Sequence, residues 1–202
     1  MKRKGLIVLA IVVIVVLGVY SWMKGSYNEM VRLNEEVQAQ SSQIENQYQR
    51  RADLIPNLVS TVKGYAEHEK STLDQVTEAR AQASQTRIDI NDAEALAKFD
   101  QAQGELSSAL SRLMAISENY PDLKANQNFR DLQTQLEGTE NRISVERRKF
   151  NETARQFNTY IKMFPRNILS NLYGFAMKTA IEDAIKYEMA QQGAETAPKV
   201  EF

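Results

Sequence analysis

The chain has 202 residues, enough for one ordinary domain with an appendage, and its 25 Lys and Arg nearly balance its 26 Asp and Glu. Without a basic excess, general nucleic-acid binding is not expected, because neutralisation of phosphates supplies most of that affinity. The absence of cysteine excludes disulfides and thiolate metal sites, and the single histidine, His68, excludes a metal site with two imidazoles.

The chain begins with a strongly apolar segment, MKRKGLIVLAIVVIVVLGVYSWMKG, in which no charge occurs between Lys4 and Lys24. As a helix, residues 5–23 would rise about 28 Å, close to the hydrocarbon thickness of a bilayer. Tyr20 and Trp22 stand at the far end, where such rings suit the headgroup region. The segment therefore predicts a transmembrane helix that contacts the lipid bilayer through residues 5–23.

The charges around this segment predict its orientation. Lys2, Arg3 and Lys4 precede it, whereas only Lys24 and Arg32 follow it closely. The positive-inside bias then places the N-terminus in the cytoplasm and the rest of a single-pass chain outside it, on the periplasmic side of the inner cell membrane. A cleaved signal peptide is the alternative, but the apolar segment is long for one and no A-x-A motif follows it.

After residue 26 the apolar residues recur at helical spacing, and the low counts of 8 Gly and 4 Pro also favour helices. The first apolar stripe consists of Val37, Ile44, Tyr48, Ile55, Leu58, Val62 and Tyr65. It keeps its phase across Pro56, which lies in RRADLIPNLV (50–59). The pattern predicts one long helix, roughly 27–82, with a kink near Ala52–Pro56. Two helices that meet at this proline are the alternative.

A second stripe predicts another helix, with Gln103 and Ser117 in its polar gaps and with Leu96, Phe99, Leu106, Leu110, Leu113 and Tyr120 as its apolar members. The linker before it, SQTRIDINDAE (84–94), holds an Asn-Asp pair that is expected to cap this helix. Pro121, in NYPD, is expected to end the helix and to stand near the start of the next one.

Two more stripes complete the pattern. The third comprises Phe129, Leu132, Leu136, Ile143, Phe150, Ala154, Phe157, Ile161 and Phe164. FPRN (164–167) joins it to a final predicted helix, about 168–190, which carries Leu172, Phe175, Ala176, Ala180, Ala184 and Tyr187.

Four stripes joined by short turns bury themselves most economically as an antiparallel bundle. The expected fold class is all-α, an N-terminal transmembrane helix followed by an elongated antiparallel four-helix bundle. The expected divisions are a cytoplasmic basic start and membrane anchor over 1–25, the helical bundle over 26–192, and a polar tail over 193–202.

Charged residues interrupt the apolar stripes at Arg51, Glu140 and Arg147. Lone buried charges are costly, whereas paired charges with satisfied hydrogen bonds are tolerated. We therefore expect an interior ion network in which Arg51 meets Glu140, with Arg147 one turn further along and Asp53 nearby. Its expected role is structural, because polar contacts of this kind fix how helices align.

No motif for catalysis, for phosphate binding or for a metal occurs in the chain, so no catalytic residue and no cofactor are expected. His68 is expected on a solvated helix face, because no positioned nucleophile stands near it. NET (151–153) matches a glycosylation sequon but carries little weight on an amphipathic helix. The basic cluster formed by Arg142, Arg148 and Lys149 is expected on the surface, where lipid headgroups or an acidic partner could bind it.

Long blocks of the chain resemble the LemA family of bacterial proteins. They lie in the expected order and cover nearly everything after the anchor: YNEMVRLNEEV (27–37), RRADLIPNLVSTVKGYAEHEK (50–70), AR (79–80), YPDLKANQNFRDLQTQLEGTENRIS (120–144), RRKFNETARQFN (147–158), FPRNIL (164–169) and APKVEF (197–202). The resemblance is weakest after LYGF (172–175), where the family often has an aromatic-rich stretch that this chain lacks.

The resemblance implies a single membrane anchor and a mostly antiparallel helical bundle, and it implies no enzyme mechanism. Relatives among magnetosome-membrane proteins favour scaffolding or adaptor work. The leading hypothesis is a membrane-anchored extracytoplasmic interaction module of undetermined biochemical role. Its partner would be an unidentified membrane or periplasmic protein, or a second copy in a homo-oligomer. The alternatives are a binding regulator of a membrane protease or of a secretion or stress system, and a hydrolase that uses Asp, Glu and Arg in a bundle cavity.

Overall fold

The computed structural model describes residues 2–181, and every regular element in this range is helical. In chain order these elements are α1 (Lys2–Lys63), the short 3₁₀ helix η1 (Glu67–Glu69), α2 (Lys70–Gln85), α3 (Ala93–Ser117), α4 (Pro121–Ala125), α5 (Gln127–Lys162) and α6 (Arg166–Tyr173). The prediction of an all-helical chain with a long apolar N-terminal helix is confirmed.

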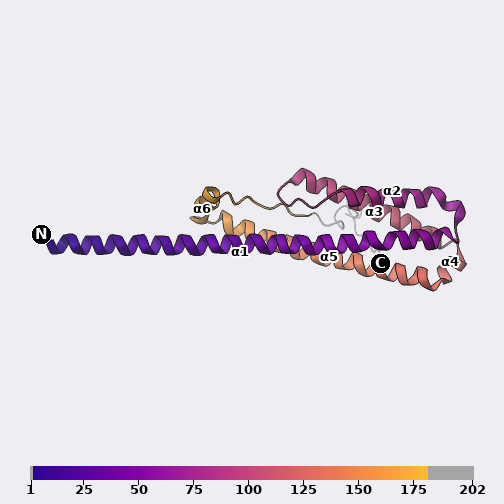
Figure 1. Ribbon diagram of the computed structural model, residues 1–202, viewed down its shortest axis with the longest axis horizontal. Helices are drawn as coiled ribbons and strands as arrows, with labels where there is room; N and C mark the ends of the chain where they lie inside the picture. The colour runs from indigo at the N-terminus through magenta and orange to yellow at the C-terminus, as the bar shows by residue number, and fades with distance from the viewer. Residues whose placement is uncertain (1, 182–202) are drawn as a thin grey trace, which may run out of the picture.

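Helix α1 has 62 residues and extends far beyond every other element at its N-terminal end (Figure 1). Its apolar start has a mean hydropathy of 2.8 over the most apolar window, and none of that window is buried against the rest of the molecule. It is the one helix in the described part of the chain that is long and apolar enough to cross a membrane. The same helix continues without a break past residue 25, and its first buried side chains are Ser26 and Met30.

The helix also continues through Pro56, as its apolar phase predicted. Proline has no backbone N–H, so the carbonyl of Ala52, one turn earlier, has no helical donor. In the structure Arg80 of α2 fills this place, because its Nε donates a hydrogen bond of 2.7 Å to that carbonyl. A neighbouring helix therefore satisfies the group that the proline leaves free.

The predicted end of this helix near residue 82 is wrong, because α1 ends at Lys63. The amides of Tyr65 and Ala66 both donate to the carbonyl of Val62, at 3.0 and 2.9 Å, and close the helix with a tight turn beside Gly64. The chain then reverses and α2 runs back along α1 (Figure 1). Tyr65, expected on the buried stripe, is 44% exposed, and Ala66 is buried in its place.

The helix starts that the sequence indicated are present. The Asp92 carboxylate accepts hydrogen bonds from the amides of Glu94 and Ala95, at 2.9 and 3.2 Å, and so caps α3. Pro121 is the first residue of the short helix α4, where a missing N–H costs nothing. A start that the sequence did not indicate follows at Asn126, whose side chain caps α5 by accepting a bond of 3.0 Å from the amide of Phe129.

The predicted final helix over 168–190 is wrong in the range that the structure describes. Helix α6 ends at Tyr173, because Gly174 adopts the left-handed conformation, with φ of 74°, that ends helices. Residues 175–181 follow in an extended form. The expected core residues Ala184 and Tyr187, and the tail 193–202, lie outside the described residues.

Four more side chains expected on the buried stripes are instead on the surface: Phe164, Leu172, Ala176 and Ala180. Phe164 is 81% exposed, because α5 ends at Lys162 and the chain turns away before it. Leu172 is 69% exposed on α6.

The helices pack as two elongated antiparallel pairs rather than as four equal neighbours (Figure 1). Helix α5 runs back along α1 in the most extensive contact of the molecule, and α2 lies along α3, with α2 also touching α1.

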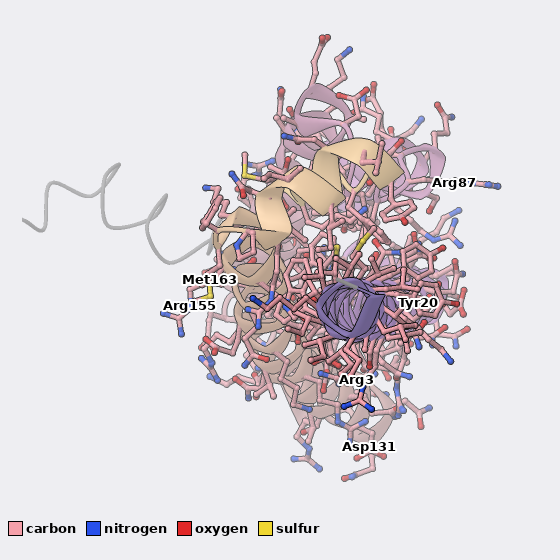
Figure 2. The ribbon with its side chains drawn as sticks, turned by 90° about the vertical axis from the view of Figure 1, so that its left-hand side faces the viewer. Arg3, Tyr20, Arg87, Asp131, Arg155 and Met163 are labelled. Carbon is pink, nitrogen blue, oxygen red and sulfur yellow. The ribbon has the colours of Figure 1, made fainter. Side chains whose placement is uncertain are left out.

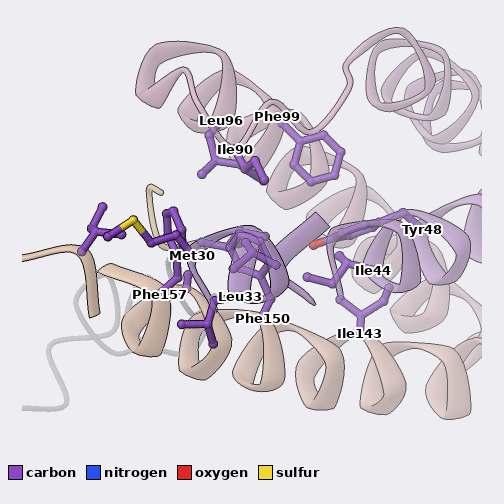
Figure 3. Close-up of a cluster of buried hydrophobic side chains, with 14 of the residues drawn as sticks. Met30, Leu33, Ile44, Tyr48, Ile90, Leu96, Phe99, Ile143, Phe150 and Phe157 are labelled. Atoms are coloured by element: carbon purple, nitrogen blue, oxygen red, sulfur yellow. The ribbon is translucent and has the colours of Figure 1, made fainter. Parts of the chain in front are cut away.

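The buried apolar side chains form two separate clusters. The proximal core lies nearer the apolar start of α1 (Figure 3) and contains Met30, Leu33, Val37, Ile44, Tyr48, Ile90, Leu96, Phe99, Ile143, Phe150, Ala154, Phe157, Ile161, Leu169 and Ile181. The distal core lies toward the far end and includes Ile55, Leu58, Val62, Leu73, Val76, Leu106, Leu113, Leu123, Phe129 and Leu136. Burial of a large apolar side chain of this kind stabilises the fold by roughly 1.5–3 kcal/mol.

Candidate functional site

A layer of polar side chains separates the proximal core from the distal core. Along α1, Tyr48 belongs to the proximal core, Ile55 to the distal core, and Arg51 lies between them. Helices α3 and α5 contribute to the same level. We call this the polar layer; it comprises Tyr48, Arg51, Asp100, Gln103, Ser107, Glu140 and Arg147.

Arg51 is the most enclosed charge of the layer, with a side chain only 3% exposed. Its Nη1 donates to Glu140 Oε2 at 2.7 Å and to Ser107 Oγ at 3.0 Å. Its Nη2 donates to the side-chain oxygen of Gln103 and, at 3.4 Å, to the Gln103 carbonyl. One guanidinium thus joins α1 to both α3 and α5.

Glu140 makes the expected ion pair, but the expectation that it lies in the interior is corrected. Its side chain is 49% exposed, so the carboxylate reaches Arg51 from the edge of the helix pair. The buried position on this turn of α5 is Thr139, 2% exposed, whose hydroxyl donates to the Gln135 carbonyl at 2.7 Å. The pair is therefore a buried guanidinium with a partly solvated carboxylate.

Asp53, expected near the network, lies outside it. Its side chain is exposed and accepts a hydrogen bond of 2.8 Å from Gln49, one turn earlier on α1. Asp53 follows Arg51 by two residues, and side chains at this spacing point to different faces of a helix.

Arg147 is buried, with a side chain 8% exposed, and it pairs with a carboxylate that the sequence did not indicate. Its Nη2 lies 2.7 Å from Asp100 Oδ1 on α3, and its Nε donates to the Tyr48 hydroxyl at 2.7 Å. Asp100 stands next to Phe99, off the apolar stripe, so nothing in its spacing signalled this role. Gln103 did leave a signal, because it occupies a polar gap of that stripe and is 6% exposed.

Tyr48 lies between the two guanidinium groups. Its ring centroid is 5.2 Å from the Arg51 guanidinium carbon and 5.7 Å from that of Arg147. Burial raises the pKa of the Tyr48 phenol against the opposing effect of both arginines, so the hydroxyl stays neutral at ordinary pH. Two arginines and two carboxylates balance in charge, and their hydrogen bonds hold α1, α3 and α5 in one register.

The basic cluster Arg142, Arg148 and Lys149 is on the surface of α5. Lys149 Nζ lies 2.8 Å from Glu146, which also accepts a hydrogen bond of 2.6 Å from Gln40 of α1. His68 is exposed on η1. Within residues 2–181 no three His, Cys, Asp or Glu side chains come together as a metal site.

A second polar contact, absent from the sequence-based expectations, fixes the extended segment after α6. The Asn158 side chain accepts from the Lys178 amide and donates to the Lys178 carbonyl, both at 2.8 Å. Asn151, two turns earlier, does the same at Ile181, at 2.9 and 2.7 Å. We call this pair the asparagine clamp. Asn151 is also the asparagine of the NET sequon. Its side-chain amide is occupied by the hydrogen bonds to Ile181, which argues against a glycan on this residue.

The side chain of Lys178 stabilises the same segment from the other side. Its Nζ donates to Asn91 Oδ1 at 2.6 Å, and the amide of Thr179 donates to the Ile90 carbonyl at 3.3 Å. Burial lowers the pKa of the Lys178 ammonium, while Asp89 opposes that effect. The segment is thus attached both to α5 and to the linker before α3.

Comparison with known proteins gives one family and several relatives. The LemA family matches residues 40–202. The chain is 28% identical over 188 residues to magnetosome protein MamQ of Magnetospirillum gryphiswaldense. The matched region covers 84% of this chain and 69% of that relative. It is 29% identical over 191 residues to magnetosome protein MamQ 2 of Paramagnetospirillum magneticum, covering 82% and 69%. Protein LemA of Metamycoplasma hominis is 29% identical over 162 residues, covering 78% and 71%.

Proposed function

Because the chain belongs to the LemA family, we propose that it is a membrane-anchored helical module that binds a protein partner at the outer face of the cell membrane. The single observation that carries this proposal is the continuity of α1. One helix contains the apolar segment 5–23 and then contributes Met30, Leu33 and Val37 to the proximal core. The segment that would span the bilayer and the domain that would bind the partner therefore share one continuous helix.

This continuity gives the module a defined reach. From residue 23 to Lys63, α1 extends about 60 Å, at about 1.5 Å per residue. The distal core would therefore stand well clear of the headgroups, where a partner can reach it. Between the headgroups and the distal core, the exposed side chains of Arg142, Arg148 and Lys149 on α5 could bind an acidic surface of a partner. We propose as the partner an unidentified membrane or periplasmic protein, or a second copy of the chain.

The proposed topology has the N-terminus in the cytoplasm, one span in the inner membrane and the helical bundle outside. It rests on Lys2, Arg3 and Lys4 ahead of the span. A reporter that is active only outside the cytoplasm, fused after residue 202, should be active. Activity of a cytoplasmic reporter at the same site would reverse the orientation, and a mature chain that lacks residues 1–18 would establish a cleaved leader instead.

Proximity labelling in native membranes tests the partner. A labelling enzyme fused after residue 202 should mark a small set of membrane or periplasmic proteins. The matched control is the same enzyme fused to residues 1–27, which keeps the span and removes the domain. Proteins enriched only with the full chain support binding, and a protease or secretion component among them would favour a regulatory role. An identical set for both fusions would refute the proposal.

We propose no enzymatic role. The two buried arginines bind Glu140, Asp100 and Tyr48 within the polar layer, an arrangement that suits a structural lock. His68, the residue type most often used as a general base, is exposed on η1, which contributes no side chain to this layer. Replacement His68→Ala should leave the biological role intact. Loss of that role at unchanged fold and abundance would favour a hydrolase.

A further inference from the structure

Helix α6 lies at the end of the domain from which the apolar part of α1 projects (Figure 1). The ring of Tyr173, its last residue, is 4.9 Å from the ring of Tyr27 on α1, and Phe175 is 5.9 Å from the same ring. Tyr27 follows Met23, the end of the uncharged segment, by four residues, or about 6 Å along the helix axis. Each headgroup layer of a bilayer is about 5–8 Å thick. If α1 spans a membrane, α6 is at headgroup level.

Figure 2 looks at this end of the molecule, and it shows α6 lying across the view while α1 is seen end on. A helix that crosses the axis of a membrane span lies roughly in the plane of the membrane. Interfacial helices adopt this orientation, and their apolar side chains enter about 5–10 Å into the boundary between headgroups and acyl chains.

The apolar side chains around α6 are exposed to a degree that single scattered surface residues do not explain. Ile168 and Leu172, four residues apart and therefore adjacent on one flank, are 58% and 69% exposed. Met163 and Phe164, immediately before the helix, are 50% and 81% exposed, and Met177 after it is 54% exposed. We call these five residues the apolar rim. Five large exposed apolar residues within residues 163–177 exceed the scatter of single residues on an ordinary surface, and such groups mark contacts with a partner or a membrane.

The neighbouring charges favour a lipid surface as the occupant. Lys162 at the end of α5 is exposed and directly precedes Met163 of the rim, and Lys24 is exposed on α1, three residues before Tyr27. Arg166, at the start of α6, holds its guanidinium 4.2 Å from the Tyr160 ring centroid. Apolar side chains flanked by cations and by Tyr and Trp rings suit the boundary of an anionic bilayer.

We propose that the apolar rim is a second membrane contact, which inserts into the interface of the same bilayer that α1 spans. This inference rests on the proposed membrane anchor. It adds that the domain is held against the membrane at two points, which restricts the tilt of α1 in the bilayer.

Spin labels on single cysteines test this proposal in the full chain, because the chain has no native cysteine. Ile168→Cys and Leu172→Cys report on the rim, and Val15→Cys reports on the span. Gln135→Cys, exposed far along α5, is the control. Each labelled chain is reconstituted in vesicles of phosphatidylcholine and phosphatidylglycerol, with helicity checked by circular dichroism.

We expect labels at 168 and 172 to shift toward the values of the span label, with high accessibility to oxygen and low accessibility to a water-soluble nickel chelate. The label at 135 should show the reverse. If the rim labels are as accessible to the nickel chelate as the label at 135, the proposal is overturned. If the label at 15 is inaccessible to nickel in the same experiment, the membrane anchor itself still stands. Magnetic coupling between the 172 labels of two chains would also overturn it, because a second copy would then cover the rim. A water-accessible label at 15 would overturn the anchor itself.

Discussion

The two partners of the central ion pair contribute unequally, because only one of them is buried. Arg51 is enclosed and bonds to Gln103, Ser107 and Glu140, so its removal leaves several polar groups without a partner. Glu140 is half exposed, so water can take its place beside the guanidinium. The polar layer therefore depends more on the arginine than on the glutamate.

We expect Arg51→Ala to lower the free energy of unfolding by about 3–5 kcal/mol, the cost of breaking a buried polar network. Glu140→Gln should cost about 1–2 kcal/mol, the range for one charged hydrogen bond at a partly solvated site. Urea unfolding of residues 26–202, which we expect to be soluble and helical, measures both. Exposed Arg50→Ala is the control and should change stability by no more than about 0.5 kcal/mol. Equal effects at 50 and 51 would contradict this account.

The contribution of Arg80 to stability is expected to depend on Pro56, because Arg80 bonds to the carbonyl that the proline leaves without a donor. Arg80→Met should cost about 1–3 kcal/mol, because the carbonyl of Ala52, a residue only 8% exposed, then has no donor. In the Pro56→Ala background the restored backbone amide satisfies that carbonyl, so the same arginine change should cost less. A double-mutant cycle measured by urea unfolding gives the coupling, expected at about 0.5–3 kcal/mol.

Arg112→Met, at an exposed position of α3, is the control for this cycle and should show no coupling to Pro56→Ala. Additive effects of the Arg80 and Pro56 changes would mean that the hydrogen bond to Ala52 does not stabilise the fold.

At this scale the sequence predicted the residues that interrupt an apolar stripe and missed the residues beside it. Arg51, Arg147 and Gln103 stand where an apolar side chain would be expected, and all three are buried. Asp100 and Arg80 lie off the stripes, and their roles depend on which helix is the neighbour. Spacing within one helix carries no information about that neighbour.

At the scale of elements, the helices were predicted well along their length and poorly at their ends. The apolar phase carries on from Val62 through Ala66 and Leu73 even though the chain reverses between them, so periodicity alone did not reveal the turn at Gly64. Gly174 likewise ends α6 where an apolar pattern continued. In both cases a glycine stands at the observed end, and the prediction, which followed the apolar stripe, continued the helix past it.

The asparagine clamp stabilises the segment that this second turn creates. Each asparagine gives two hydrogen bonds to the segment, worth about 1 kcal/mol apiece, so Asn158→Ala should weaken the attachment by about 2 kcal/mol. Amide hydrogen exchange at Lys178 should then be faster by more than about tenfold, since 1.4 kcal/mol corresponds to a factor of ten. Asn141→Ala, exposed on α5, should leave that exchange rate unchanged. If the rate at Lys178 stays the same in Asn158→Ala, the clamp does not hold the segment.

At the scale of the whole molecule, α1 determines where the domain stands. It contributes side chains to both cores and also carries the apolar segment, so any tilt of one part moves the other. The polar layer fixes α5 and α3 against this helix, and α6 and its apolar rim lie next to the point where it leaves the domain. The continuation of this helix through Pro56 was predictable from its uninterrupted apolar phase. The position of α6 was not, because it depends on the contact between Tyr27 and Tyr173.

The central claim is that the membrane span and the domain share one unbroken helix, and a distance measurement tests it most directly. Spin labels at Val15→Cys, in the span, and Gln43→Cys, exposed in the domain, are separated by 28 residues, which predicts about 42 Å along a continuous helix. Pulsed electron resonance on the full chain in lipid bilayers should give one narrow distribution near that value. A broad distribution, or one centred at a clearly shorter distance, would show that the helix breaks between the span and the domain and would contradict the account.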